Sequence, residues 1–268
     1  MNDYFEAIKK FTEILANIQK NYEETVAPAM ANMAKFFTEH MKGIDKFVDI
    51  VRKVALGYQI TEKEVVRILK KYKWFITPEM PISILNKIIE IDRQGKGKYK
   101  KVNELFVVYF SSNNFYELKK LIKKWDEVPL FKKRMKILKD CVSFITENKN
   151  KKLNIVNIVL PALIVQIDGI INDYLVLKTG QPARTFRDIK VAFKTNRPKV
   201  LTSKLDELIN DIILDIFLQT SVKYTPLEKP YYFNRHKILH GENIKYGRID
   251  YLIKSFLILD LLSELNRK

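Results

Sequence analysis

Glycine and proline, the residues that most often interrupt helices, are scarce in this chain, with 8 glycines and 9 prolines among 268 residues. Apolar residues recur every three to four positions over long stretches, as at Phe5, Ile8 and Phe11, and this spacing places them on one face of an α-helix. Alternation with a period of two is scarce, although Phe106–Phe110 is compatible with one short strand. The sequence therefore predicts an all-α fold.

Several helix ends are also indicated by local sequence. Thr61 and Glu64 form a capping box, and Asn113 or Asn114 is suited to begin a further helix. An amphipathic helix is expected over Leu205–Phe217. The other helices are expected at about residues 27–56, 81–93, 102–110, 130–147, 153–178 and 247–266.

One polar segment divides the chain. Glu147–Lys152 has no apolar residue and lies between two strongly apolar helical patterns. We therefore predict two domains, a multi-helix N-terminal bundle over residues 1–148 and a second helical domain over residues 149–268. Residues 1–148 carry no motif that identifies a role. We expect this domain to sense a signal, to regulate the second domain or to bind a partner.

The cysteine count and the apolar pattern exclude several classes of protein. A single cysteine, Cys141, rules out a disulfide framework and every multi-cysteine metal site. The most apolar stretch, Ile155–Leu177, is interrupted by polar residues such as Asp168, and a charge in lipid is costly. No basic stretch followed by an apolar core opens the chain as in a signal peptide. We expect a cytoplasmic protein without a membrane span.

The net charge points to a polyanionic partner but does not locate it. There are 48 Lys and Arg residues against 31 Asp and Glu residues, a formal charge of +17. Such an excess often accompanies nucleic acid binding. A lysine-rich composition explains it equally well, because the charge is spread along the whole chain.

The segment Tyr231–Gly241 is the most informative part of the sequence. The chain has no glycine-rich phosphate loop, no nucleophile elbow and no zinc-binding histidine pattern of the metalloprotease type. It has only three histidines, and this segment contains two of them. It is polar and basic within an otherwise apolar half, and it ends in a glycine that can stop a helix.

The spacing of these polar residues limits what one copy of the segment can do. His236 and His240 are four residues apart, so a helix puts both rings on one face. A metal site there needs further ligands, and the nearby candidates are only Glu242 and Asp250. Arg235 and His240 are five residues apart, which is about 140° around a helix. One copy of the segment therefore does not easily direct both side chains toward the same atom.

Asn234–Gly241 resembles the R-x-x-x-x-H signature of the HEPN superfamily of helical ribonucleases and nucleic-acid-binding domains. The resemblance covers about residues 150–268 and implies a four- or five-helix up-down bundle. The order of parts is similar to that family: a first long helix with an inward acid, Asp168, a variable segment (182–198), a long helix (199–222), the motif and a closing apolar helix (Ile249–Leu265).

The resemblance implies a metal-independent endoribonuclease without cofactors, in which two motifs form one composite active site across a homodimer. His240 is expected to move protons, and Arg235 to bind the scissile phosphate. Asn234 and His236 are expected to orient these groups, and Asp168 to pair with Arg235. The expected products are a 2′,3′-cyclic phosphate and a 5′-OH end.

Contacts with RNA outside this centre are expected from Lys237, Lys245, Arg184 and Arg187. Ribonucleases of this type are usually toxins or abortive-infection defence proteins, so an antitoxin or a regulatory partner is a further expectation. Two alternatives stay open. In the first, the domain is a non-catalytic module that binds RNA, a nucleotide or a protein. In the second, the chain is a helical scaffold in which Arg235 and His240 only stabilise a helix end.

Overall fold

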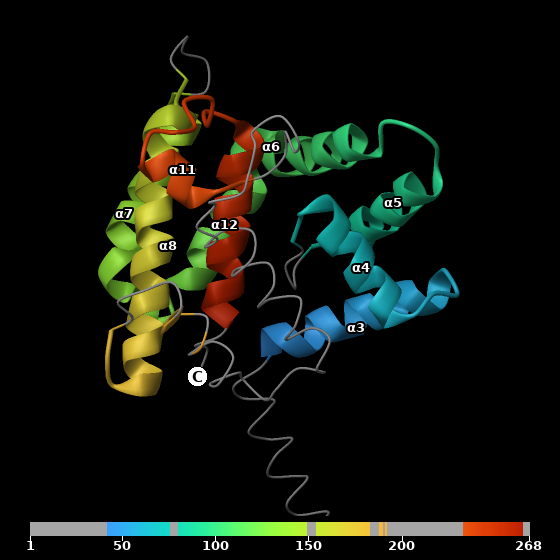
Figure 1. Ribbon diagram of the computed structural model, residues 1–268, viewed down its shortest axis with the longest axis horizontal. Coiled ribbons are helices and arrows are strands. Elements are labelled where there is room, and N and C mark those ends of the chain that lie inside the picture. The colour runs from blue at the N-terminus through green and yellow to red at the C-terminus, as the bar shows by residue number, and fades with distance from the viewer. Residues whose placement is uncertain are drawn as a thin grey trace, which may run out of the picture. The chain divides into compact units, whose positions relative to one another are not determined.

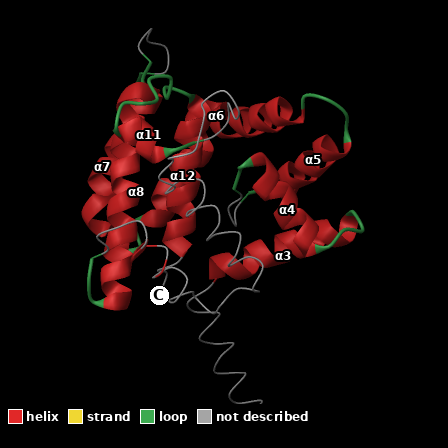
Figure 2. Ribbon diagram, in the orientation of Figure 1, coloured by secondary structure: helices red, strands yellow, loops and turns green. Residues whose placement is uncertain are grey.

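The computed structural model describes residues 42–75, 80–148, 154–182, 188–189, 191 and 233–264 (Figure 1). Every regular element among these residues is helical, and Figure 2 contains no strand in them. The prediction of an all-α fold is therefore confirmed for the described part. The strand considered for Phe106–Phe110 is wrong, since these residues are helical. The helices expected before residue 42 and over Leu205–Phe217 lie outside the described residues.

The first described part of the chain forms three helices followed by a longer one that packs on the third. They are α3 (Lys42–Gly57), α4 (Glu62–Tyr72), α5 (Ile82–Arg93) and α6 (Lys98–Trp125). The capping box is confirmed, because the Thr61 hydroxyl accepts a hydrogen bond from the backbone N–H of Glu64 at 3.2 Å. Helix α5 matches its predicted range of 81–93 within one residue.

Helix α6 contains a sharp kink. Its backbone leaves the helical region at Ser112, and the next three residues have positive φ angles: Asn113 at 49°, Asn114 at 55° and Phe115 at 58°. Asparagine tolerates this left-handed conformation, whereas a bulky side chain rarely adopts it. The side chain of Phe115 is nevertheless buried, at 6% exposure. The two asparagines thus mark a break between two helical segments, as their sequence suggested.

The remaining elements follow the predicted ranges closely. They are a 3₁₀ helix, η2 (Pro129–Arg134), α7 (Met135–Glu147), α8 (Val156–Thr179), α11 (Arg235–Leu239) and α12 (Ile249–Glu264). Helix α8 packs on α7 and on α12, and α12 also packs on α6 (Figure 1). The domain boundary predicted between residues 148 and 149 therefore falls between two helices that pack on each other.

Helix α12 is buried along nearly its whole length, from Asp250 to Ser263. Its charged side chains are consequently in contact with other elements. The Asp260 carboxylate, which is fully buried, accepts hydrogen bonds from Trp125 Nε1 at 2.9 Å and Lys124 Nζ at 3.2 Å. Both donors lie in the last turn of α6. These bonds supply partners for a charge that would be costly to bury alone.

Lys254, six residues earlier on α12, is also fully buried. Its ammonium group lies over the ring of Trp74, 4.7 Å from the centroid, in a cation–π contact. Trp74 itself stacks on Phe106 with centroids 4.2 Å apart. Burial lowers the pKa of Lys254 to about 8, although Asp250 opposes this shift. Trp74, after α4, thus contacts both the first part of α6 and helix α12.

Among the helices that the structure describes, one has the length and composition of a membrane span. The stretch Val156–Leu177 of α8 is long and apolar enough to cross a bilayer, and more than half of it is buried within the protein. Buried core helices of soluble proteins have the same length and apolar composition. The absence of a membrane span and the cytoplasmic location therefore stay predictions.

The buried lysine predicts a specific pH dependence of stability. The pKa of Lys254 is lower in the folded chain than its ordinary value of 10.5, so the unfolded chain binds more protons between pH 8 and 10.5. The penalty for burying the charge is complete below pH 8 and is removed as the pH rises. The free energy of unfolding should therefore increase by about 3 kcal/mol over this range relative to Lys254→Met.

Urea unfolding of the wild type and of Lys254→Met at several pH values measures this difference, with Lys136→Met as the exposed baseline variant. Lys254→Met is also expected to be more stable than the wild type at pH 7, because an apolar side chain removes the cost of desolvation. A difference between the two proteins that stays constant from pH 7 to 10.5 would contradict the prediction.

Candidate functional site

The polar segment singled out in the sequence forms a short capped helix, α11. Asn234 has an extended backbone, and its side-chain oxygen accepts a hydrogen bond from the N–H of Lys237 at 3.1 Å. This is the geometry of an N-cap. The helix ends at Leu239, His240 forms the C-cap, and Gly241 follows with a left-handed φ of 74°. The glycine therefore stops the helix as the sequence suggested.

Apolar contacts hold α11 in place. Phe233, just before the cap, is fully buried and stacks on Tyr251 of α12 with ring centroids 5.2 Å apart. Ile238 is also buried, at 4% exposure. These two anchors fix the orientation of the helix, and they leave His236 partly exposed and His240 exposed.

An ion pair joins α11 to α8. The guanidinium of Arg235 donates a hydrogen bond to the carboxylate of Asp168, and both side chains are partly buried. Burial raises the pKa of Asp168, and the charge of Arg235 and its hydrogen bond oppose that rise. The structure thus brings together two predicted site residues that are 67 positions apart, and the carboxylate holds the guanidinium in one orientation.

The two histidines lie against each other. The ring centroids of His236 and His240 are 4.2 Å apart, with an angle of 48° between the ring planes. This contact follows from their spacing of four residues on a helix. Within one copy of the chain, Arg235 is directed to Asp168 on α8, whereas His240 has His236 as its neighbour.

The residues predicted to contact RNA are only partly described. Lys237 is mostly buried, and its ammonium lies 3.9 Å from the carboxylate of Glu242. Lys245 is exposed in the loop that follows α11. Arg184 and Arg187 lie outside the described residues. Of the four, Lys245 is the described side chain most open to solvent.

A set of contacts that the sequence did not suggest holds the loop between α11 and α12. The side-chain amide of Asn154 donates to the carbonyl of Gly247 at 3.0 Å, and the Tyr246 hydroxyl donates to the carbonyl of Asn157 at 3.3 Å. A Cβ at Gly247 would lie 2.0 Å from the side-chain oxygen of Asn157, so only glycine fits without displacement. About 90 residues separate the partners, and no local pattern indicates such contacts.

The described residues offer little to a metal ion. No group of three or more His, Cys, Asp and Glu side chains lies together in the ranges that the structure covers. For the metal alternative, the described residues therefore supply the two histidines His236 and His240 without a third ligand beside them. Zinc sites ordinarily have at least three protein ligands.

Taken together, α11 offers an oriented guanidinium and two adjacent imidazoles near the surface. A guanidinium can bind two oxygens of a phosphate group, and imidazoles exchange protons near neutral pH. No protein-family model, curated protein or solved structure matches the chain. The function is therefore inferred from the chemistry of α11 and its neighbours.

The N-cap gives a first test of this arrangement. Replacing Asn234 with alanine removes the acceptor for the Lys237 N–H in a buried position, so the free energy of unfolding should fall by about 1 kcal/mol. Asn234→Ser keeps a capping oxygen and should retain most of the stability.

Urea unfolding measures both variants, and Asn243→Ala provides a matched control. Asn243 accepts a backbone N–H from Lys245 at the same distance of 3.1 Å, but in the exposed loop, so a smaller loss is expected. Equal losses in Asn234→Ala and Asn234→Ser would show that the hydrogen bond does not carry the effect.

Proposed function

We propose that this chain is a metal-independent endoribonuclease of the HEPN type, with its active site on α11. The observation that carries the proposal is the ion pair between Arg235 and Asp168, made from the same short segment that brings the rings of His236 and His240 into contact. The R-x-x-x-x-H spacing, the all-helical surroundings and the inward acid on the preceding long helix support it. No cofactor is required, because RNA contains its own nucleophile.

The reaction proceeds by attack of a ribose 2′-OH on the adjacent phosphate. His240, the exposed imidazole, accepts the proton of the 2′-OH and returns a proton to the departing 5′-oxygen. Arg235 binds two oxygens of the phosphate and stabilises the negative charge that gathers in the transition state. The products are a 2′,3′-cyclic phosphate and a 5′-OH end.

The other predicted residues have positioning roles. Asp168 holds the guanidinium of Arg235, and Asn234 sets the start of the helix that carries it. His236 contacts the ring of His240 and limits its orientations.

Two copies of the chain form the complete site. Within one copy the side chains of Arg235 and His240 have different neighbours, Asp168 and His236 respectively. A symmetric homodimer lets the arginine of one motif and the histidine of the other act on the same phosphate. The closed two-fold arrangement is also the most common one among homo-oligomers.

The partner is RNA, and the positive charge of the chain assists its binding. A net charge of +17 attracts a polyanion over distances beyond direct contact. Lys245 beside the motif, together with Lys237, Arg184 and Arg187, contacts phosphates at the site. In this function the chain is a cytoplasmic toxin or anti-phage defence protein, with residues 1–148 as the part that receives a trigger or binds an antitoxin.

One observation favours a non-catalytic alternative. The Arg235 side chain is only 17% exposed and already forms an ion pair, as it would in a module that uses this contact for stability alone. Such a module binds RNA, a nucleotide or a protein without cutting it. The two functions differ in one measurable result. Replacing His240 slows RNA cleavage if the protein is a ribonuclease, whereas a binding module has no cleavage rate to change.

The decisive variant is His240→Ala. It removes the proton carrier from an exposed position, so the folded protein should cleave labelled transfer or messenger RNA at least about 10²-fold more slowly. Lys136→Ala, which removes an exposed side chain on α7, should keep the wild-type rate. Analysis of the RNA ends should identify cyclic phosphates, and EDTA should leave the rate unchanged.

Wild-type cleavage by folded His240→Ala would refute this mechanism. No cleavage by any form of the protein, with RNA binding retained, would support the non-catalytic module. Full loss of activity on adding EDTA would support the metal alternative at His236 and His240.

The composite site predicts complementation between subunits. A purified heterodimer of Arg235→Ala and His240→Ala contains one intact arginine and one intact histidine on opposite copies, so it should regain activity that neither variant has alone. A heterodimer of the wild type with the doubly substituted chain has both intact groups on one copy and should be inactive. The reverse pattern of activity would show that Arg235 and His240 act from the same copy.

A further inference from the structure

The turn that joins α5 to α6 carries many cations and no acidic residue (Figure 1). We call the segment Arg93–Lys101 the basic turn. Its sequence is Arg-Gln-Gly-Lys-Gly-Lys-Tyr-Lys-Lys, with five cations among nine residues. These residues are exposed, apart from the partly buried Lys98. The basic turn is therefore a strongly positive surface, and none of the residues proposed for RNA cleavage belongs to it.

Two of these cations bond to neutral groups. The guanidinium of Arg93 donates to the backbone carbonyl of Tyr58 at 3.0 Å. The ammonium of Lys101 donates to the side-chain oxygen of Gln94 at 3.3 Å. Neither acceptor carries a charge, so both bonds position the cations without cancelling them. Because guanidinium and ammonium groups each have several N–H donors, both side chains retain donors for a ligand.

The other exposed lysines of the turn are also poorly neutralised. Lys100 lies 3.8 Å from the Glu104 carboxylate, but both side chains are more than half exposed, and such a pair stabilises little. Lys96 has no hydrogen bond or ion pair within the part of the chain that the structure describes. Lys96 is thus the cation of the turn that is most available to a ligand.

Asp92, which precedes the turn, does not balance its charge. The Asp92 carboxylate accepts hydrogen bonds from Lys71 Nζ and Tyr72 Oη, each at 2.5 Å. Lys98 donates to the backbone carbonyl of the same residue. One negative charge therefore lies beside two ammonium groups, and a positive excess remains where these side chains of α4, α5 and α6 meet.

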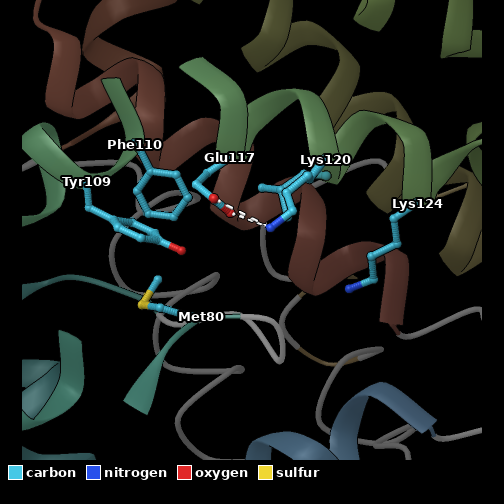
Figure 3. Close-up of a pocket in the computed structure, with 7 residues that line it drawn as sticks. Met80, Tyr109, Phe110, Glu117, Lys120 and Lys124 are labelled. Atoms are coloured by element: carbon cyan, nitrogen blue, oxygen red, sulfur yellow. Dashed lines mark hydrogen bonds and ion pairs between the residues drawn. The ribbon is translucent and has the colours of Figure 1, made fainter. Parts of the chain in front are cut away.

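The lysines after the kink of α6 are different, because carboxylates neutralise them. Lys120 and Lys124 line a small pocket at the kink (Figure 3). Lys120 lies 3.2 Å from the Glu117 carboxylate, and Lys124 bonds to the buried Asp260 at 3.2 Å. The positive net charge of the chain is therefore not available everywhere that lysines gather. The basic turn is distinguished by cations whose partners are mostly neutral.

An exposed aromatic ring lies among these cations. Tyr99 is 46% exposed, and its ring contacts the buried Tyr72 edge to face, with centroids 5.1 Å apart. This contact restrains the ring, and nearly half of the residue stays open to solvent. Aromatic side chains beside cations are typical of sites for single-stranded nucleic acid, because unpaired bases stack on the rings while the cations bind the phosphates.

An anionic membrane also attracts cations, but the turn does not have the composition of a membrane-binding segment. Segments that lie on a membrane insert several large apolar side chains into it. Tyr99 is the one aromatic residue of Arg93–Lys101, which contains no large aliphatic residue. The composition of the turn thus favours nucleic acid.

We infer that the basic turn binds single-stranded nucleic acid. Lys96 and Lys101 bind phosphates of the backbone, and the ring of Tyr99 stacks on an unpaired base. The binding requires no reaction at α11, so the inference does not depend on the proposed ribonuclease activity. In a ribonuclease, the turn gives the N-terminal helices a role in holding the substrate.

Fluorescence anisotropy of the full chain with a labelled oligothymidylate of about 16 nucleotides tests the inference. This DNA lacks the 2′-OH that the proposed cleavage requires, so binding is measured in the absence of any reaction. The oligonucleotide should bind saturably. Its affinity should fall as the salt concentration rises, because cations that bind phosphates release counterions.

The informative variant is the double substitution Lys96→Gln with Lys101→Gln. Each phosphate contact on a single strand contributes about 0.7 to the slope of log affinity against log salt concentration, so the variant should reduce the size of this slope by about 1.4. Lys123→Gln with Lys136→Gln removes the same charge from exposed positions outside the turn, and it should leave the slope unchanged. Equal changes in the two variants would show that net charge alone determines binding and would overturn the inference.

Tyr99 gives a second test. Tyr99→Leu removes the ring and should weaken binding at least about fivefold, whereas Tyr99→Phe keeps a stacking ring and should bind like the wild type. Tyr116→Leu is the matched control, because Tyr116 is an exposed tyrosine of α6 outside the turn, at 52% exposure. Unchanged affinity of Tyr99→Leu, or an equal loss for a duplex of the same length, would refute binding of single strands.

A membrane surface is the competing outcome. In sedimentation with vesicles that contain phosphatidylserine, the two double variants should bind equally. Loss of vesicle binding in Lys96→Gln with Lys101→Gln, together with wild-type affinity for oligothymidylate, would assign the turn to a membrane and overturn the inference.

Discussion

The burial of α12 is the constraint on which the rest of the described structure depends. A helix buried from Asp250 to Ser263 cannot leave Lys254 and Asp260 without partners, because an isolated buried charge costs several kcal/mol. Those partners come from separate parts of the chain. Trp74 after α4 lies under the ammonium of Lys254, and the last turn of α6 supplies the donors to Asp260. The positions of α4, α6 and α12 are therefore linked through these two charges.

The same helix connects α11 with the end of α6. Tyr251, near its first turn, stacks on Phe233 and so fixes the start of α11, from which Arg235 reaches Asp168 on α8. At its other end, Asp260 bonds to Lys124, which lines the pocket at the kink of α6. The proposed catalytic groups and the kink of α6 are thus carried by different helices that pack on a common support.

Local sequence predicted those features that depend on neighbouring residues alone. The Thr61 capping box, the glycine stop at Gly241 and the contact between His236 and His240 all follow from spacings of a few residues. The helix ranges were also predicted from local sequence, because the spacing of apolar residues indicates which face of a helix is buried. The strand considered for Phe106–Phe110 was wrong because a short run of apolar and aromatic residues suits a buried helix equally well.

By itself, the sequence determined the all-α class, most of the described helix ranges and the group of polar residues at 234–240. These properties depend on backbone preferences and on periodicity, which act over a few positions. Only the tertiary structure decided that Arg235 meets Asp168, that Asn154 and Asn157 hold the loop after α11, and that the kink of α6 opens a pocket. Each of these results depends on how helices distant in the sequence pack, and side-chain packing over such separations leaves no periodic signal in the chain.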